Sequence, residues 1–354
     1  MTRRSWLISL PAAAAAQTVD ERIRQMAQAP PLALTFTGTT AAQCRQWQQQ
    51  FKAKLEACLG PYQPPARWSI ASETKTDLDG HTRHQITLRA PGHPDLPLYL
   101  LRPARPAAGK RAGILALHGH GTFGHESVAG IDSSEERRRE IASANYDYGR
   151  QLALRGYTVA IPCFTPFGIR LGDRKAYRGE DPCAVTFARL QLFGKVLIAE
   201  NLRDSLWALA FLASQPDVDA ARLGCVGLSY GGRMTMLTSA LSPRIKVAVC
   251  SGALNVMQER VRGRYSCEAQ IIPGLLQYGD VPEIGSLIAP RPCLWEVGRK
   301  DGLMVQPWAD NGYAAMERAW SALGAGENLS LDSHEGAHRW SGVKAFPLLD
   351  RVLA

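Results

Sequence analysis

A serine in the segment Gly-Leu-Ser-Tyr-Gly, Ser229, has the setting of a nucleophile. A short apolar run precedes it and a helical segment follows, so the serine falls on a tight strand-to-helix turn. Such a turn needs glycine where backbones approach closely, and it exposes the serine hydroxyl above the sheet with a helix N-terminus behind it. The same pattern also occurs as a simple tight turn, so its partners decide whether the serine does chemistry.

Two later strand ends supply the residue types that a nucleophilic serine requires. A base must take the hydroxyl proton, and a carboxylate must orient that base. Asp301 follows the apolar run 292–298, and His338 follows the run 328–332. We therefore predict Ser229 as nucleophile, His338 as general base and acid, and Asp301 as the orienting carboxylate.

The segment 334–338, His-Glu-Gly-Ala-His, contains rivals for these roles. His334 is an alternative base, and Asp332 and Glu335 are alternative carboxylates. The segment also matches the His-Glu-x-x-His zinc signature, which requires a helix to bring both histidines to one face. A strand precedes it and a glycine interrupts it, so we expect no metal. A zinc-dependent hydrolase using His334 and His338 stays as the alternative.

The apolar run 113–118 ends in Gly119-His120-Gly121, a loop able to point a backbone N–H at a developing oxyanion. We predict the N–H groups of His120 and Tyr230 as this oxyanion hole. The segment 119–124 also matches the dinucleotide fingerprint Gly-x-Gly-x-x-Gly. Its surroundings lack the helix and the acidic residue of such sites, so we expect no nucleotide cofactor.

Substrate contacts are expected from segments that flank these loops. The loop after strand 157–161 carries one aromatic and two basic residues suited to an acid or a sugar, and two tryptophans near the catalytic loops could form a sugar platform. Packing inside the fold is the competing interpretation of each. The candidates are Phe167, Arg170, Arg174, Trp308 and Trp340.

The order of elements predicts an α/β fold with a mostly parallel central sheet flanked by helices. Trp47, Phe51 and Leu55 recur at helical spacing within 42–59. Antiparallel-type strands follow, and then strands and helices alternate. The expected strands are 67–75, 82–89, 97–102, 113–118, 157–161, 222–227, 245–250, 292–297 and 328–332, and the later helices are 140–155, 199–214, 230–241, 307–322 and 343–353.

Length and charge limit the possible functions. With 354 residues, of which 45% are hydrophobic, the chain can bury one large core. The net charge of +9 comes from scattered basic residues, so nucleic-acid binding is not expected. Outside the apolar N-terminal segment, no stretch of the sequence is long enough and apolar enough for a membrane span. We expect a twin-arginine-like signal peptide at 1–17, hence export, a helical extension at 18–65 and a catalytic domain at 66–354.

Export would permit disulfides among the eight cysteines. Cys225 and Cys293 fall inside expected buried strands and are best interpreted as core residues. The pair that we favour is Cys250 with Cys267. The weaker candidates are Cys163 with Cys183, and Cys44 with Cys58.

Over residues 40–354 the chain resembles a known family. The joint pattern of Leu-His-Gly-His-Gly at 117–121, Gly-Leu-Ser-Tyr-Gly-Gly at 227–232, Ile-Ala-Pro-Arg-Pro at 288–292 with Asp301, and Gly-Ala-His at 336–338 is similar to dienelactone-hydrolase-related esterases near the acetyl xylan esterases. The resemblance implies an α/β-hydrolase fold and a serine carboxylesterase without a cofactor, often acting on esters of plant polysaccharides. Dienelactone hydrolases have cysteine where this chain has Ser229, which favours ordinary ester hydrolysis. A small-molecule or carbohydrate ester is therefore the expected substrate, and a peptidase of the same fold is an alternative.

Overall fold

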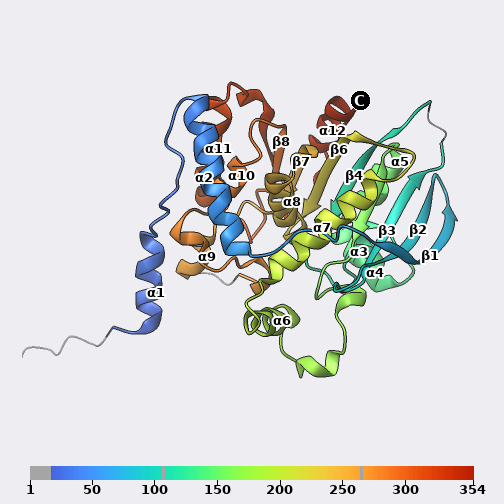
Figure 1. Cartoon of the computed structure of the whole chain (residues 1–354), viewed down its shortest axis with the longest axis horizontal. Helices are drawn as coiled ribbons and strands as arrows, with labels where there is room; N and C mark the ends of the chain where they lie inside the picture. The colour runs from blue at the N-terminus through green and yellow to red at the C-terminus, as the bar shows by residue number, and fades with distance from the viewer. Residues whose placement is uncertain (1–16, 106–107, 264–265) are drawn as a thin grey trace, which may run out of the picture.

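The computed structural model describes residues 17–105, 108–263 and 266–354, and it is built around one nine-stranded sheet with helices on both faces (Figure 1). The sheet order is β1-β2-β3-β5-β4-β6-β7-β8-β9. Strands β4 to β9 run parallel, while β1, β2 and β3 form an antiparallel edge. The strands are β1 (Ser69–Leu78), β2 (His81–Arg89), β3 (Leu96–Pro103), β4 (Arg111–Leu117), β5 (Thr158–Pro162), β6 (Val218–Leu228), β7 (Ile245–Ser251), β8 (Cys293–Gly298) and β9 (Leu329–His334).

The helices fill the connections between these strands. They are α1 (Val19–Gln28), α2 (Ala41–Leu59), α3 (His125–Val128), α4 (Glu135–Ala144), α5 (Tyr148–Leu154), α6 (Pro182–Gln191), α7 (Leu197–Ala213), α8 (Tyr230–Leu241), α9 (Met257–Gly263), α10 (Val281–Ser286), α11 (Gln306–Ala322) and α12 (Ala345–Leu353). Short 3₁₀ turns lie at Gly168–Arg170, Arg174–Tyr177, Glu268–Gln270, Leu275–Gln277 and Gly326–Asn328. The α/β fold expected from the sequence is confirmed.

Helix α2 shows how the sequence determines a local element. Thr40 and Gln43 form a reciprocal capping box at its start. Trp47, Phe51 and Leu55 are buried along one face, as their helical spacing predicts. These side chains belong to the same hydrophobic cluster as the sheet and helices α7 and α8. The N-terminal extension therefore contributes to the core of the catalytic fold.

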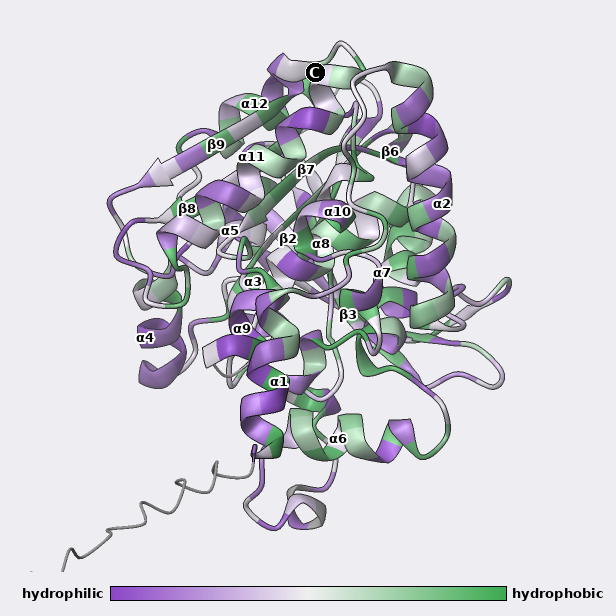
Figure 2. Cartoon of the chain, turned by 90° about the vertical axis from the view of Figure 1, so that its left-hand side faces the viewer, coloured by the Kyte–Doolittle hydropathy of each residue, from purple (hydrophilic) through white to green (hydrophobic). Residues whose placement is uncertain are grey.

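The sheet separates two hydrophobic layers. Along β4, Leu115 and Leu117 pack into the layer that α2, α7, α8 and α11 cover, whereas Ile114 and Ala116 face the layer that α5 and α12 cover. This alternation follows from the two-residue period of a strand. Figure 2 shows the apolar strands at the centre and a hydrophilic α4, which has no buried residue, at the surface.

The structure divides one expected helix in two and does not describe most of the expected signal peptide. The helix expected at 140–155 is wrong as a single element, because Asn145 adopts a left-handed conformation (φ 50°) that ends α4 before α5 begins. The predicted signal peptide, 1–17, lies outside the described residues apart from Gln17 and stays a prediction. Over the described parts of the chain, no helix is both long and apolar enough to cross a bilayer.

The strand order places two sequence motifs side by side. The chain moves outward from β4 to β5 on one side and then returns to β6 on the other, so the order reverses at β4. Ligands of open α/β sheets bind at the carboxyl ends of the strands beside such a reversal. The Gly119-His120-Gly121 loop after β4 and Ser229 after β6 both lie there, because β4 and β6 are adjacent and parallel.

Candidate active site

Ser229 occupies a strained turn between β6 and α8. Its φ of 64° and ψ of −124° are unusual for a residue with a side chain, and such strain collects at functional sites. Its N–H donates to the carbonyl of Ser251 at 2.8 Å. A side chain at Gly231 would overlap the carbonyl of Leu117, and one at Gly232 would overlap that of Ser251. The glycines of the motif are therefore required by close backbone packing.

The loop after β4 lies directly against the serine. A Cβ added at Gly119 would come within 2.8 Å of the Cβ of Ser229. The Gly119 N–H is held by the hydroxyl oxygen of Tyr146 at 2.7 Å. The rings of His120 and Tyr230 are 5.3 Å apart, so the structure brings together the two residues predicted for the oxyanion hole.

The backbone donors of these two residues are available for a ligand. Tyr230 is the first residue of α8, where a helix offers its N–H no internal acceptor. The His120 N–H makes no hydrogen bond to another group within the described residues. Two uncommitted donors beside a strained serine are what stabilisation of an oxyanion requires.

His118 is a site residue that sequence reasoning missed. It is fully buried, and its Nε2 accepts the N–H of Phe164 at 2.8 Å. Its proton must therefore be on Nδ1, which donates to the Gly119 carbonyl at 2.8 Å. Burial lowers the pKa of His118 to about 4, so it stays neutral and joins the loop after β4 to the loop after β5.

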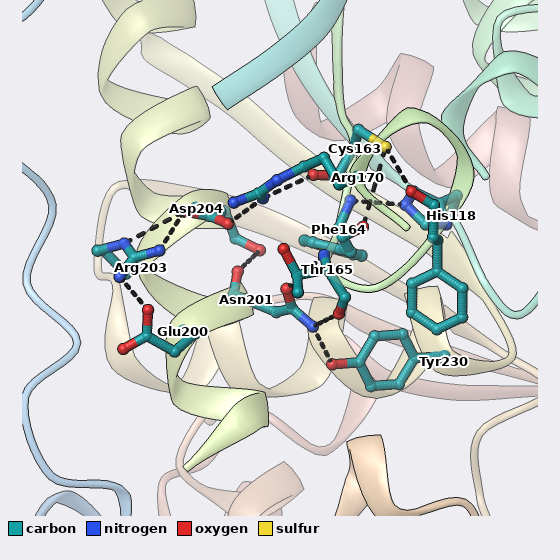
Figure 3. Close-up of polar contacts among 12 residues, drawn as sticks. His118, Cys163, Phe164, Thr165, Arg170, Glu200, Asn201, Arg203, Asp204 and Tyr230 are labelled. Carbon is teal, nitrogen blue, oxygen red and sulfur yellow. Dashed lines mark hydrogen bonds and ion pairs between the residues drawn. The ribbon is translucent and has the colours of Figure 1, made fainter. Parts of the chain in front are cut away.

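Asn201 on α7 joins the loop after β5 to the start of α8 through hydrogen bonds (Figure 3). Its amide exchanges two hydrogen bonds with the backbone of Thr165, at 2.9 and 2.8 Å. It also donates to the hydroxyl of Tyr230 at 2.8 Å. The start of α8 and the loop after β5 are thus held by one buried amide.

Arg170 is paired inside the protein. It forms an ion pair with the fully buried Asp204 and donates to the carbonyl of Cys163 at 2.9 Å (Figure 3). Arg203 binds the same carboxylate at 2.9 Å and also pairs with Glu200. The Arg170 side chain is only 9% exposed, which favours a structural role over the substrate contact expected from the sequence.

Asp301 and His338 form a hydrogen-bonded pair. His338 Nδ1 lies 2.6 Å from Asp301 Oδ2, and the other carboxylate oxygen accepts the N–H of Leu303 at 2.8 Å. The Asp301 side chain is nearly inaccessible, whereas that of His338 is 27% exposed. The Nε2 of His338 has no hydrogen-bond partner within the described residues, Ser229 included, so it is free to accept a proton.

The imidazole also lies close to the strand ends that hold the serine. A Cβ added at Gly252 would be 2.9 Å from His338 Cε1 and 3.0 Å from a methyl of Leu228. Gly252 follows Ser251, whose carbonyl holds the Ser229 N–H, and Leu228 precedes Ser229. The predicted base and nucleophile therefore share one small region, with Nε2 still uncommitted.

Backbone contacts attach the histidine loop to the aspartate loop. Arg299 N–H donates to His334 O at 2.8 Å, and Lys300 N–H donates to Gly336 O at 3.0 Å. Gly298 has no room for a side chain, since a Cβ there would approach Gly336 O to 2.6 Å. These contacts hold the loops of Asp301 and His338 together, although the two residues are far apart in sequence.

Glu296 is a second residue that the sequence analysis missed. It is fully buried in β8 and accepts the N–H groups of Ser341 at 3.2 Å and Gly342 at 2.9 Å, just beyond His338. Burial raises the pKa of Glu296 to about 7. A charged residue inside an apolar strand was the available sequence signal, because such a group is buried only with partners.

The rivals in the His-Glu-Gly-Ala-His segment have other partners. His334 Nδ1 accepts the N–H of Gly336 at 3.1 Å, in a bend and not in a helix. Asp332 accepts the Ser341 hydroxyl at 2.7 Å, and the exposed Glu335 lies 3.5 Å from Arg299. The helical geometry of the zinc signature is therefore not present here.

The other predicted substrate residues differ in their access to this region. Phe167 lies edge-on to His120 at 5.2 Å and borders a cavity of about 670 Å³. Trp340 is fully buried against Tyr148, so its ring offers no surface to a ligand. Trp308 is half-buried beneath Arg262. The side chain of Arg174 lies outside the described residues.

None of the disulfides expected from the sequence is present. All eight cysteines are free. Cys250 is fully buried in β7 and interacts with Cys293, while Cys267 interacts with Cys183. The favoured Cys250–Cys267 pairing was wrong because Cys250 lies inside the core, whereas Cys267 lies in a loop beside His120, which is in the segment that follows β4.

Comparison with known proteins agrees with this fold. The chain matches no family model. It is 30% identical over 279 residues to the protein named "Putative hydrolase YtaP" from Bacillus subtilis (strain 168), covering 75% of this chain and 85% of that protein. The chain therefore belongs to the α/β-hydrolases, in the same hydrolase family as YtaP.

Solved structures show the same fold at lower identity. A structure from Bacteroides fragilis described as a "putative acetyl xylan esterase" matches with a TM-score of 0.75 and 16% identity, over 91% of this chain and 84% of that one. A glucuronoyl esterase from Solibacter usitatus matches with a TM-score of 0.63 and 17% identity, over 91% of this chain and 96% of that one. These similarities confirm the α/β-hydrolase fold expected from the sequence.

Proposed function

We propose that this protein is a serine carboxylesterase that forms an acyl-enzyme on Ser229. The Asp301–His338 hydrogen bond carries the proposal, because it leaves Nε2 of the imidazole free beside the strained serine. His338 takes the hydroxyl proton as Ser229 attacks the ester carbonyl, and it returns that proton to the leaving alcohol. Asp301 holds the tautomer and stabilises the imidazolium.

The oxyanion of each tetrahedral intermediate is assigned to the N–H groups of His120 and Tyr230. After the alcohol leaves, His338 activates a water molecule, which attacks the acyl carbonyl and releases the acid. Apo geometry of such sites is commonly loose and tightens with substrate, so the serine–histidine hydrogen bond is assigned to the Michaelis complex.

The substrate is assigned as a small acyl or methyl ester, including esters carried on plant polysaccharides. The esterases among the fold relatives support this class. The cavity of about 670 Å³ is lined by His120 and Phe167, and Tyr177 and Glu180 are also among its lining residues. Acetylated xylan, methyl-esterified uronates and short peptides compared side by side would separate the ester classes from a peptidase.

The direct test is Ser229→Ala. We expect turnover of p-nitrophenyl acetate to fall by about 10⁶-fold, as loss of a serine nucleophile does elsewhere, and labelling by a fluorophosphonate probe to disappear. Ser143→Ala, at an exposed serine on α4, is the matched control and should keep both. Full turnover by Ser229→Ala would overturn the proposal.

A further inference from the structure

A cluster of metal-ligating side chains includes one residue of the candidate oxyanion loop. His120 comes from the loop after β4, Cys183 from the first turn of α6, and Cys267 from the loop after α9. The His120 Nε2 is 3.0 Å from the Cys267 sulfur. The ligand atoms of all three residues lie within 4.8 Å of one another.

The proposed esterase mechanism uses none of these side chains. It needs only the backbone N–H of His120, and both cysteines are free thiols. The three residues come from separate segments, so their convergence is a property of the folded chain. One imidazole and two thiols are the ligand types that Zn²⁺ prefers in tetrahedral sites.

A carboxylate is also within reach. Asp181, Cys267 and Glu268 form a second group whose ligand atoms lie within 4.8 Å of one another. One oxygen of Asp181 accepts the N–H groups of Cys183 and Ala184 at 2.8 and 3.0 Å, which leaves the second oxygen for another partner. Asp181 adjoins Cys267 but shares no group with His120 and Cys183, so its carboxylate must turn towards the ion to become the fourth ligand.

We propose that His120, Cys183 and Cys267, with the Asp181 carboxylate as fourth ligand, form a structural Zn²⁺ site. The ion binds Nε2 of His120 and the two sulfurs, and the thiols of Cys183 and Cys267 each release a proton to solvent on binding, so affinity falls at low pH. His120, Asp181 and Cys183 all line the cavity of about 670 Å³, which gives the ion access from solvent.

The site would attach α6 to the candidate active site. Helix α6 lies at the bottom of Figure 1, apart from the layers around the sheet. Its first turn carries two of the four ligands, and His120 sits on the loop that offers the oxyanion donor. Bound zinc would therefore fix one wall of the substrate cavity against the catalytic loop, without taking part in bond making.

Metal analysis of the full chain tests this proposal. After removal of metal with a chelator and loading with Zn²⁺, we expect about one ion per chain. Loading with Co²⁺ should give the charge-transfer absorption of thiolate ligation. Cys183→Ser and Cys267→Ser should lose stoichiometric binding and that absorption, whereas Cys58→Ser, at a partly exposed cysteine on α2, should keep both.

Two results would overturn it. Stoichiometric zinc in a chain carrying both Cys183→Ser and Cys267→Ser would place the ion elsewhere, for instance at His334 and His338. Six reactive thiols in the denatured, chelator-treated protein, in place of the eight that the sequence contains, with a Cys183–Cys267 disulfide peptide, would show a disulfide there. Zinc binding by Ser229→Ala should be unchanged, so failure of the esterase proposal and failure of this one are distinguishable.

Discussion

The two sides of the candidate active site are built differently. On the oxyanion side, His118, Asn201 and Tyr230 are fully buried or nearly so, and hydrogen bonds occupy both ring nitrogens of His118 and the amide of Asn201. On the acid–base side, His338 is 27% exposed and has one hydrogen bond, through Nδ1 to Asp301.

The difference follows from what each side must do. Donors that stabilise a developing charge act best when the fold fixes them before the reaction. A group that accepts and returns a proton needs a free nitrogen, and Nε2 of His338 has no partner among the described residues. The buried, neutral His118 holds backbone groups in place, whereas the partly exposed His338 keeps one nitrogen free for proton transfer. The surroundings of each histidine determine which of these tasks it can perform.

Asp301→Asn should have the largest effect after Ser229→Ala, and it acts on the acid–base side alone. The amide would hold the wrong tautomer of His338 and could not stabilise the imidazolium, so we expect kcat for p-nitrophenyl acetate to fall by about 10⁴-fold. Glu335→Gln, at the exposed rival carboxylate, is the control and should stay within about twofold. A large loss in Glu335→Gln with little loss in Asp301→Asn would reassign the carboxylate.

Arg170→Met tests the buried ion pair that supports the oxyanion side. Removal of one partner from a buried ion pair leaves Asp204 with Arg203 alone and should lower the free energy of unfolding by about 3 kcal/mol. Since Arg170 is buried, KM for acidic and neutral esters should change in parallel. Arg299→Met breaks an exposed pair with Glu335 and should cost under about 1 kcal/mol. Unchanged stability with a rise in KM for uronate esters alone would restore the substrate role.

The sequence allowed most of the fold to be predicted. The expected helix 230–241 matches α8, and the parallel strands lie within a few residues of their predicted bounds. Apolar runs and glycine turns are local signals, and they sufficed for these elements. The break at Asn145 was missed because a left-handed asparagine, unlike a glycine or proline, gives no clear stop signal between the polar α4 and the partly buried α5.

The site could be predicted only in part. Ser229, Asp301 and His338 follow strand ends, so chain order alone proposes them, and the Asp301–His338 contact agrees with that proposal. His118, Glu296 and Asn201 were missed because their roles depend on partners 36 to 46 residues away in sequence. The cysteines were paired wrongly for the same reason, since spacing does not reveal which loops meet.

Glu296→Gln tests, through the pH dependence of stability, the contact between Glu296 on β8 and the backbone of Ser341 and Gly342. Burial raises the pKa of Glu296 from 4.5 to about 7, so the folded chain binds this proton more tightly than the unfolded chain. Its contribution to stability is complete below pH 4.5 and is lost as pH rises through about 7. Glutamine does not ionise, so between pH 5 and pH 8 the variant should gain on the order of 2 kcal/mol relative to wild type.

Urea unfolding at both pH values measures this difference. Glu335→Gln is the matched control, because its carboxylate is exposed and should give no pH-dependent gain. The kcat of Glu296→Gln should fall modestly, since one amide oxygen must replace two carboxylate oxygens at Ser341 and Gly342. Parallel stability curves for wild type and Glu296→Gln would show that this buried carboxyl does not titrate as inferred.

Tyr230→Phe should have the smallest effect and separates side chain from backbone on the oxyanion side. The variant removes the hydroxyl that accepts from Asn201 but keeps the N–H assigned to the oxyanion. We expect a loss of about 1 kcal/mol in the free energy of unfolding, because Asn201 keeps its bonds to Thr165. Turnover should fall less than about fivefold, in kcat and not in KM, as a slightly displaced donor would cause. Tyr313→Phe on α11 controls for removal of a phenol hydroxyl elsewhere. A loss of turnover in Tyr230→Phe as large as that in Asp301→Asn would mean that the Tyr230 hydroxyl itself contacts the reacting ester. The oxyanion side would then supply a side chain to the reaction and not only backbone donors.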